Sequence, residues 1–130
     1  MHSSSELLAS ESASHLGRDV ERHLDCHLEI DERALHLLKK RSRQGKESLS
    51  YYEQLYLCFW AVDYSLEHHG DLSVADDFEP NAVIRFFAFA QQQGWPNWQQ
   101  VEQAIEEQQL RACHMQLQDK AVAYFNGQFA

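Results

Sequence analysis

The most apolar and aromatic stretch of the chain reads YYEQLYLCFWAV and occupies residues 51–62. From Leu55 to Val62 no polar residue interrupts it, which is typical of a helix that other elements cover on all sides. The run is too short to cross a bilayer, because a membrane span requires roughly 20 apolar residues. We therefore expect a buried core helix at this position and no membrane segment.

Both ends of this helix carry sequence signals. Ser50 and Glu53 have the spacing of a capping box, in which the serine oxygen accepts a free backbone N–H and the glutamate reaches back to the N–H of the cap. Gly70 follows two histidines and suits the C-terminal cap, where glycine is common and where cations favour the negative end of the helix. The sequence therefore predicts a central helix over about 51–69.

An amphipathic helix is predicted between Gly17 and Arg43. Asp31 could break it and cap a second helix that begins at Glu32. Residues 1–15 contain few large apolar side chains and are expected to form a frayed segment, so that a single helical domain covers 16–130. The apolar stripe of the helix consists of Val20, Leu24, Leu28, Ile30, Ala34, Leu35 and Leu38.

A second core helix is predicted over about 82–93, after a polar, acidic connector at 71–79. Pro80 suits the first turn of this helix. A buried strand is the alternative for so short an apolar run, but its alanines and the glutamines that follow favour a helix. Beyond it, Asn97 and Gln100 again have capping-box spacing, which predicts the start of another helix.

The C-terminal segment carries two apolar faces. A single exposed helix does not need both, so either the chain kinks around Gln108 and Gln109 or the segment is sandwiched between the core and a second protein surface. One face holds Val101, Ala104, Ile105, Ala112, Met115 and Val122. Nearly opposite lie Leu110, Cys113, Leu117, Ala121 and Tyr124. Together these patterns predict an all-α, compact single-domain bundle of about five or six helices around the central helix.

The charge of the chain is strongly uneven. The formal net charge is −9, and residues 1–46 hold eight acids and eight bases, whereas residues 47–130 hold twelve acids and three bases. An acidic surface of this kind repels nucleic acid and anionic membranes and attracts basic proteins, although it also serves solubility. We therefore expect a basic protein partner, and neither direct nucleic-acid binding nor membrane binding.

Other features of the sequence bear on the cellular location of the protein and on a possible binding site. The three cysteines lack paired spacing, and the N-terminus lacks a basic segment followed by an apolar one, which predicts a cytoplasmic protein. We also expect the protein to be of bacterial type. One basic cluster could bind phosphate, stabilise the end of its helix or dock against the acidic half of the chain. It consists of Lys39, Lys40, Arg41, Arg43 and Lys46.

Candidate chemistry is sparse. His23, His27 and Asp31 are spaced four residues apart and could share a metal ion on one helix face, or form a partly buried polar ladder. No HExxH or CxxC motif accompanies them. Cys113 and His114 cannot act as a nucleophile and its base through adjacency, because neighbours on a helix do not face each other. We expect no catalytic residue and no cofactor.

The leading hypothesis is a non-enzymatic binding protein, such as an inhibitor, an immunity-like protein or a regulatory factor, that engages a basic partner and could imitate nucleic acid. One alternative is a metal-binding protein or small enzyme that uses the two histidines and Asp31. Another is a homodimeric scaffold that self-associates through Leu110, Leu117 and Tyr124. The expected partner contacts are Asp71, Asp76, Asp77, Glu79, Glu102, Glu106, Leu110, Leu117 and Tyr124.

Overall fold

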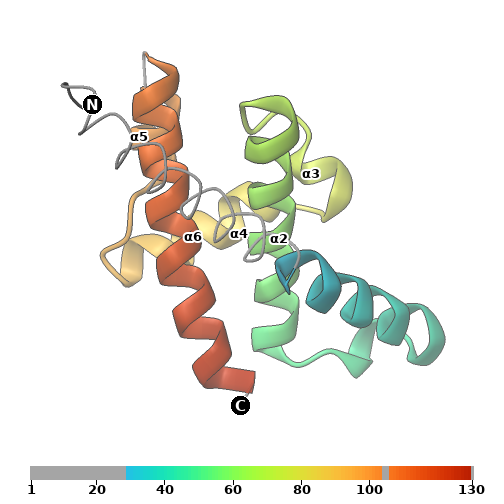
Figure 1. Ribbon diagram of the computed structural model, residues 1–130. Coiled ribbons are helices and arrows are strands. Elements are labelled where there is room, and N and C mark those ends of the chain that lie inside the picture. The colour runs from blue at the N-terminus through green and yellow to red at the C-terminus, as the bar shows by residue number, and fades with distance from the viewer. Residues whose placement is uncertain (1–28, 104–105, 130) are drawn as a thin grey trace, which may run out of the picture. The chain divides into compact units, whose positions relative to one another are not determined.

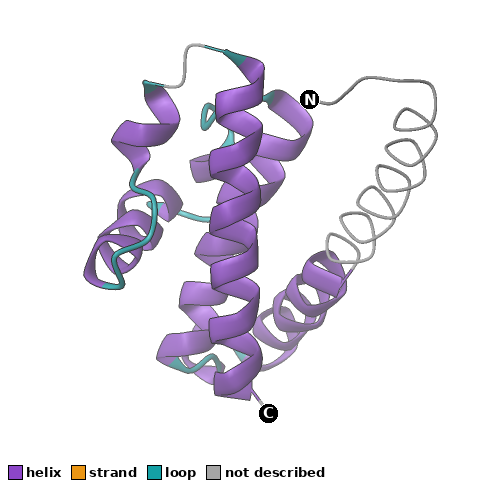
Figure 2. Ribbon diagram, turned by 60° about the vertical axis from the view of Figure 1, so that its left-hand side comes forward, coloured by secondary structure: helices purple, strands orange, loops and turns teal. Residues whose placement is uncertain are grey.

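The computed structural model describes residues 29–103 and 106–129, and these residues contain helices and loops but no strand (Figure 2). Residues 29–44 are helical. The all-α fold class is therefore confirmed. The elements that follow are the 3-10 helix η1 (Lys46–Ser48) and the α-helices α2 (Tyr51–His69), α3 (Ala75–Phe78), α4 (Ala82–Gln92), α5 (Trp98–Glu102) and α6 (Glu107–Phe129).

By their internal contacts the residues form two compact units, 1–33 and 34–130. Of the first unit, only residues 29–33 are described, and they are helical. Glu29 and Ile30 are already helical, so Asp31 does not cap a helix that begins at Glu32. The elements from η1 to α6 all belong to the unit 34–130.

The central helix α2 begins and ends where its capping signals predict. Ser50 Oγ accepts the N–H of Glu53 at 3.2 Å, and a carboxylate oxygen of Glu53 accepts the N–H of Ser50 at 2.8 Å. At the other end Gly70 adopts a left-handed conformation with φ 73°, and its N–H donates to the carbonyl of Leu66. Glycine takes this conformation without the steric cost that a side chain would add.

Three helices meet around aromatic side chains in the core. Figure 1 shows α2 and α6 side by side, running in opposite directions, with α4 crossing them. Phe59 of α2, Phe86 of α4 and Phe125 of α6 are all buried. The ring centroid of Phe59 lies 5.6 Å from that of Phe86 and 5.9 Å from that of Phe125. The core therefore joins segments far apart in sequence, and the prediction that α2 is covered by other elements is confirmed.

The acidic connector contains an additional turn of helix, α3, that its polar sequence did not predict. Ala75 at the start of α3 is fully buried. The hydroxyl of Ser65 in α2 donates to the carbonyl of Asp71 at 2.6 Å and accepts the N–H of Val74 at 3.3 Å. These bonds hold the connector against the end of α2, where its backbone can form a short helix.

The helix α4 begins later than Pro80. Asn81 has a left-handed backbone with φ 58°, which separates the proline from the helix, and the first helical residue is Ala82. The prediction that Pro80 occupies the first turn is therefore wrong. The side chain of Asp76 in α3 instead satisfies a free N–H at the start of α4, because its Oδ1 accepts the N–H of Val83 at 3.1 Å.

The C-terminal segment forms two helices, as the first of the two alternatives predicted. Helix α5 starts with the expected capping box: Asn97 Oδ1 accepts the N–H of Gln100 at 3.0 Å, and Gln100 Oε1 accepts the N–H of Asn97 at 2.7 Å. The break before α6 falls a few residues earlier than Gln108. Among the described residues no helix is long and apolar enough to cross a membrane.

Candidate functional site

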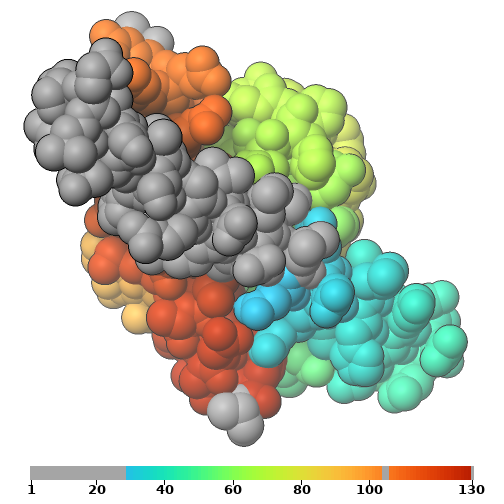
Figure 3. All heavy atoms as spheres, in the orientation of Figure 1, coloured from blue at the N-terminus to red at the C-terminus, as the bar shows by residue number. Residues whose placement is uncertain are grey.

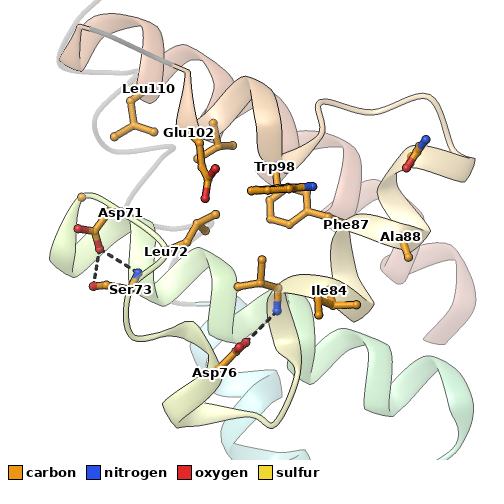
Figure 4. A pocket seen from close by; sticks show the side chains of 14 residues that line it. Asp71, Leu72, Ser73, Asp76, Ile84, Phe87, Ala88, Trp98, Glu102 and Leu110 are labelled. Carbon is orange, nitrogen blue, oxygen red and sulfur yellow. Dashed lines mark hydrogen bonds between the residues drawn. The ribbon is translucent and has the colours of Figure 1, made fainter.

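A groove with a volume of about 1050 Å³ opens between the α2–α3 turn, α4, α5 and the start of α6 (Figure 4). Helix α4 forms one side of it with Ile84, Phe87, Ala88 and Gln91. These positions follow the spacing i, i+3, i+4 and i+7, so a single face of α4 is turned towards the groove. The main apolar residues of the other walls are Leu72, Trp98, Val101 and Leu110.

Large apolar side chains of this groove are open to solvent. Ile84 is 71% exposed and Trp98 is 42% exposed. Exposed apolar side chains that gather in one groove mark an interaction site more often than scattered apolar residues do. The groove is therefore the candidate binding site of the unit 34–130.

Every titratable side chain that lines the groove is acidic. Asp71 and Asp76 belong to the connector side, and Glu102 belongs to α5 on the other side. Figure 4 shows Glu102 pointing across the opening towards the turn that contains Leu72. No lysine, arginine or histidine is among the described residues that line it. A cation on a ligand would thus meet carboxylates on both sides.

Two of these carboxylates are held in place by the backbone. Asp71 Oδ1 accepts the hydroxyl of Ser73 at 2.6 Å and its N–H at 3.0 Å, and these bonds hold the pKa of Asp71 below its ordinary value. Asp76 is fixed by the N–H of Val83 at the start of α4. Both groups are oriented before any ligand arrives, which lowers the ordering cost of binding.

The structure brings four of the predicted contact residues together in the groove. These are Asp71, Asp76, Glu102 and Leu110. Asp77 and Glu106 are exposed but are not part of its lining. The sequence signal that could have indicated the groove is the spacing of Ile84 and Ala88 on α4. They are one helical turn apart on a helix whose remaining apolar residues face the core.

Of the other three predicted contact residues, Leu117 and Glu79 are buried and Tyr124 is half-buried. Leu117 is 2% exposed. The ring of Tyr124 packs against those of Phe89 and Trp95, with centroids at 5.0 Å and 5.9 Å. Glu79 is buried and forms an ion pair with Arg41.

Two cations of the basic cluster pair with acids of the same unit. Arg41 Nη1 lies 2.9 Å from both carboxylate oxygens of Glu79. Lys40 Nζ lies 3.3 Å from Glu53 in the first turn of α2. The suggestion that the cluster docks against the acidic half of the chain is therefore confirmed for these two residues.

A buried polar cluster between α2 and α6 was missed by the sequence reasoning. His114 Nε2 lies 2.6 Å from Asp63 Oδ1, and Gln118 Nε2 donates to the same oxygen at 3.0 Å. His114 Nδ1 lies 3.9 Å from Glu67, one helical turn beyond Asp63. The available signal was an acid directly after the longest apolar run, together with a histidine and a glutamine four residues apart on α6.

The metal hypothesis stays a prediction. His23 and His27 lie outside the described residues, and Asp31 is half-buried in the helical segment 29–44. Within the part of the chain that the structure describes, no group of three or more histidine, cysteine, aspartate or glutamate side chains could hold a metal ion. Cys113 is half-buried beside Pro96 in a smaller, shallow pocket.

Comparison of the chain with protein-family models, with curated proteins and with solved structures finds no match.

Proposed function

We propose that this protein is a non-enzymatic binding protein that holds a basic partner protein through the groove between α4 and α5. The observation that carries the proposal is the combination of exposed apolar surface with a titratable lining that is entirely acidic. Apolar contacts supply affinity, and carboxylates around them select a cationic partner and speed its approach. An inhibitor or a regulatory factor requires both affinity for its partner and selectivity among partners.

Self-association through the groove is less favoured by its charge. A second copy seated there would bring acidic edges close to acidic edges, and like charges brought together oppose binding. Direct imitation of nucleic acid is also less favoured. Such a surface requires an array of acidic side chains, whereas this groove is lined largely by apolar residues. The groove instead suits a protein segment that offers both apolar and basic side chains.

Co-purification with the full chain tests this function. The triple variant Asp71→Asn, Asp76→Asn and Glu102→Gln removes the three charges, and the two asparagines keep the hydrogen-bond acceptors. We expect wild-type protein to retain its partner at low salt and release it at high salt, and the triple variant to lose it at low salt.

The control is a second triple variant with the same change in net charge outside the groove: Glu47→Gln, Glu107→Gln and Asp119→Asn. These three acids are exposed and are not part of the lining. It should retain the partner as wild type does. Equal loss in both variants would mean that net charge alone governs binding, and retention in both would reject the groove as the binding site.

A further inference from the structure

The side of the groove formed by α4 presents a stripe of side chains against which a second helix could pack. Ile84, Ala88 and Gln91 are exposed, while Phe87 between them lies at the bottom and is 2% exposed. Large and small side chains thus alternate along one stripe of α4. Helices pack by placing the side-chain ridges of one into the spaces between the ridges of the other, and a small residue such as Ala88 lets the partner approach closely.

The facing wall supplies an aromatic anchor and an acid on the same helical face. Trp98 and Glu102 are four residues apart on α5, so they are neighbours on its surface, and Figure 4 shows both at the groove. Glu102 makes no hydrogen bond or ion pair with the described residues. A guanidinium group that pairs with this carboxylate could also lie against the indole ring, which adds a cation–π contact.

The opposite wall completes the charge pattern. Asp71 is exposed and its Oδ1 accepts both hydrogen bonds from Ser73, so Oδ2 takes no part in these bonds, and Asp76 lines the same side of the groove. Acids therefore lie on both sides of an apolar floor. The complement of this surface is an apolar stripe with cations at its two margins, which is the pattern of a basic amphipathic helix.

We infer that the groove takes an amphipathic helix of a partner protein, with the apolar stripe of that helix on Ile84, Ala88 and Trp98 and its arginine or lysine side chains on Asp71 and Glu102. This inference rests on the proposed function and adds the structural class of the partner segment. Apolar packing sets the position of the helix, and the carboxylates exclude acidic and neutral competitors.

Fluorescence anisotropy with a labelled synthetic peptide tests the inference on the full chain. The probe is a peptide of about 18 residues, long enough to be partly helical in water, with leucines at i, i+3, i+4 and i+7 and arginines at the stripe margins. A second peptide has the same composition in an order that destroys the stripe. We expect the patterned peptide to bind at least about tenfold more tightly than the shuffled one.

Variants of exposed residues locate the binding without disturbing the fold. Ala88→Gln fills the closest point of approach without a charge change, and Ile84→Ser removes exposed apolar surface. Each should weaken the patterned peptide about tenfold or more. The matched controls are Ala123→Gln on the exposed side of α6 and Leu35→Ser, a residue that is 53% exposed outside the groove. Neither control should change the affinity.

Each other outcome overturns the inference in a way that separates it from the proposed function. Equal binding of the two peptides would show that charge alone is recognised and would reject a helix as the occupant. Partner capture that depends on the groove acids but is unaffected by Ala88→Gln and Ile84→Ser would leave the proposed function standing and reject the helix. A dimer in light scattering that Ala88→Gln converts to monomer would assign the groove to a second copy.

Discussion

His114 and Asp63 face each other across the contact between α6 and α2, with Nε2 and Oδ1 2.6 Å apart and both side chains buried. They are 51 positions apart in sequence. Gln118 donates to the same carboxylate oxygen, so α6 is held to α2 by two bonds one helical turn apart. A polar cluster in an apolar contact can specify which faces meet, because other registers would leave these groups unsatisfied.

Replacing one member of this pair should destabilise the fold strongly. His114→Leu leaves the Asp63 carboxylate in the core without its histidine, and we expect the free energy of unfolding to fall by about 3–5 kcal/mol. Urea denaturation followed by circular dichroism measures it. The double variant Asp63→Leu, His114→Leu should recover most of the loss, because apolar residues often replace a buried pair at little cost. A double variant less stable than the single one would contradict this.

The ion pair between Arg41 and Glu79 should contribute more to stability than the exposed pair on α6. Arg41→Met removes the nearer cation from a carboxylate that is only 5% exposed and leaves it Arg85, whose Nη1 is 3.9 Å away, and we expect a loss of about 1.5–3 kcal/mol. Arg111→Met is the matched control, because Arg111 and Glu107 are 71% and 84% exposed and such pairs contribute about 0–1 kcal/mol. Equal effects in urea denaturation would contradict the role assigned to burial.

The capping box of α2 should be visible in the acid dependence of stability. Burial raises the pKa of Glu53, but hydrogen bonds from the Ser50 N–H and from Lys40 outweigh it and hold this pKa below 4.5. A lowered pKa in the folded state stabilises the protein above the unfolded-state pKa, and this contribution disappears as the pH falls through the folded-state pKa.

Glu53→Gln should therefore lose less unfolding free energy than wild type between about pH 7 and about pH 3, because the carboxylate that titrates is gone. Ser50→Ala should cost about 1 kcal/mol at neutral pH through loss of the cap. Urea denaturation at each pH measures both effects. An acid dependence in Glu53→Gln equal to that of wild type would rule out this contribution.

Thiol reactivity should distinguish Cys58 from Cys113. Burial raises the pKa of the Cys58 thiol to about 11, so only about one molecule in a thousand carries the thiolate at about pH 8. Burial also raises the pKa of Cys113, but this side chain is only half-buried. We expect iodoacetamide to label Cys58 at least about tenfold more slowly than Cys113 in the native protein.

Peptide mapping by mass spectrometry identifies the labelled residue. In urea the two cysteines should react at similar rates, because unfolding removes the burial that protects them. Comparable labelling of both in the native protein would show that the contact around Cys58 opens on the timescale of the reaction.

The sequence by itself determined most of the helices and both ends of α2, but it did not predict α3 and it misplaced the starts of α4 and α6. Ser50 with Glu53, Asn97 with Gln100, and Gly70 are local signals whose hydrogen bonds span three or four residues, and each is found in the structure. Local chemistry decides such features because both partners lie on the same short stretch of chain. The helical spacing of apolar residues likewise indicated which segments are helices.

Only the tertiary structure decided which faces meet and which stay open. Periodicity shows that Ile84 and Ala88 share a face, but not that both are exposed while Ala82, Phe86, Phe89 and Ala90 of the same helix are buried. From the sequence alone Glu79 resembles any other surface acid, and only the fold places Arg41 beside it. Asp63 likewise resembles the polar end of an apolar run, and only the packing of α6 on α2 places His114 beside it. These outcomes depend on contacts between distant segments, and no single stretch of sequence encodes such a contact.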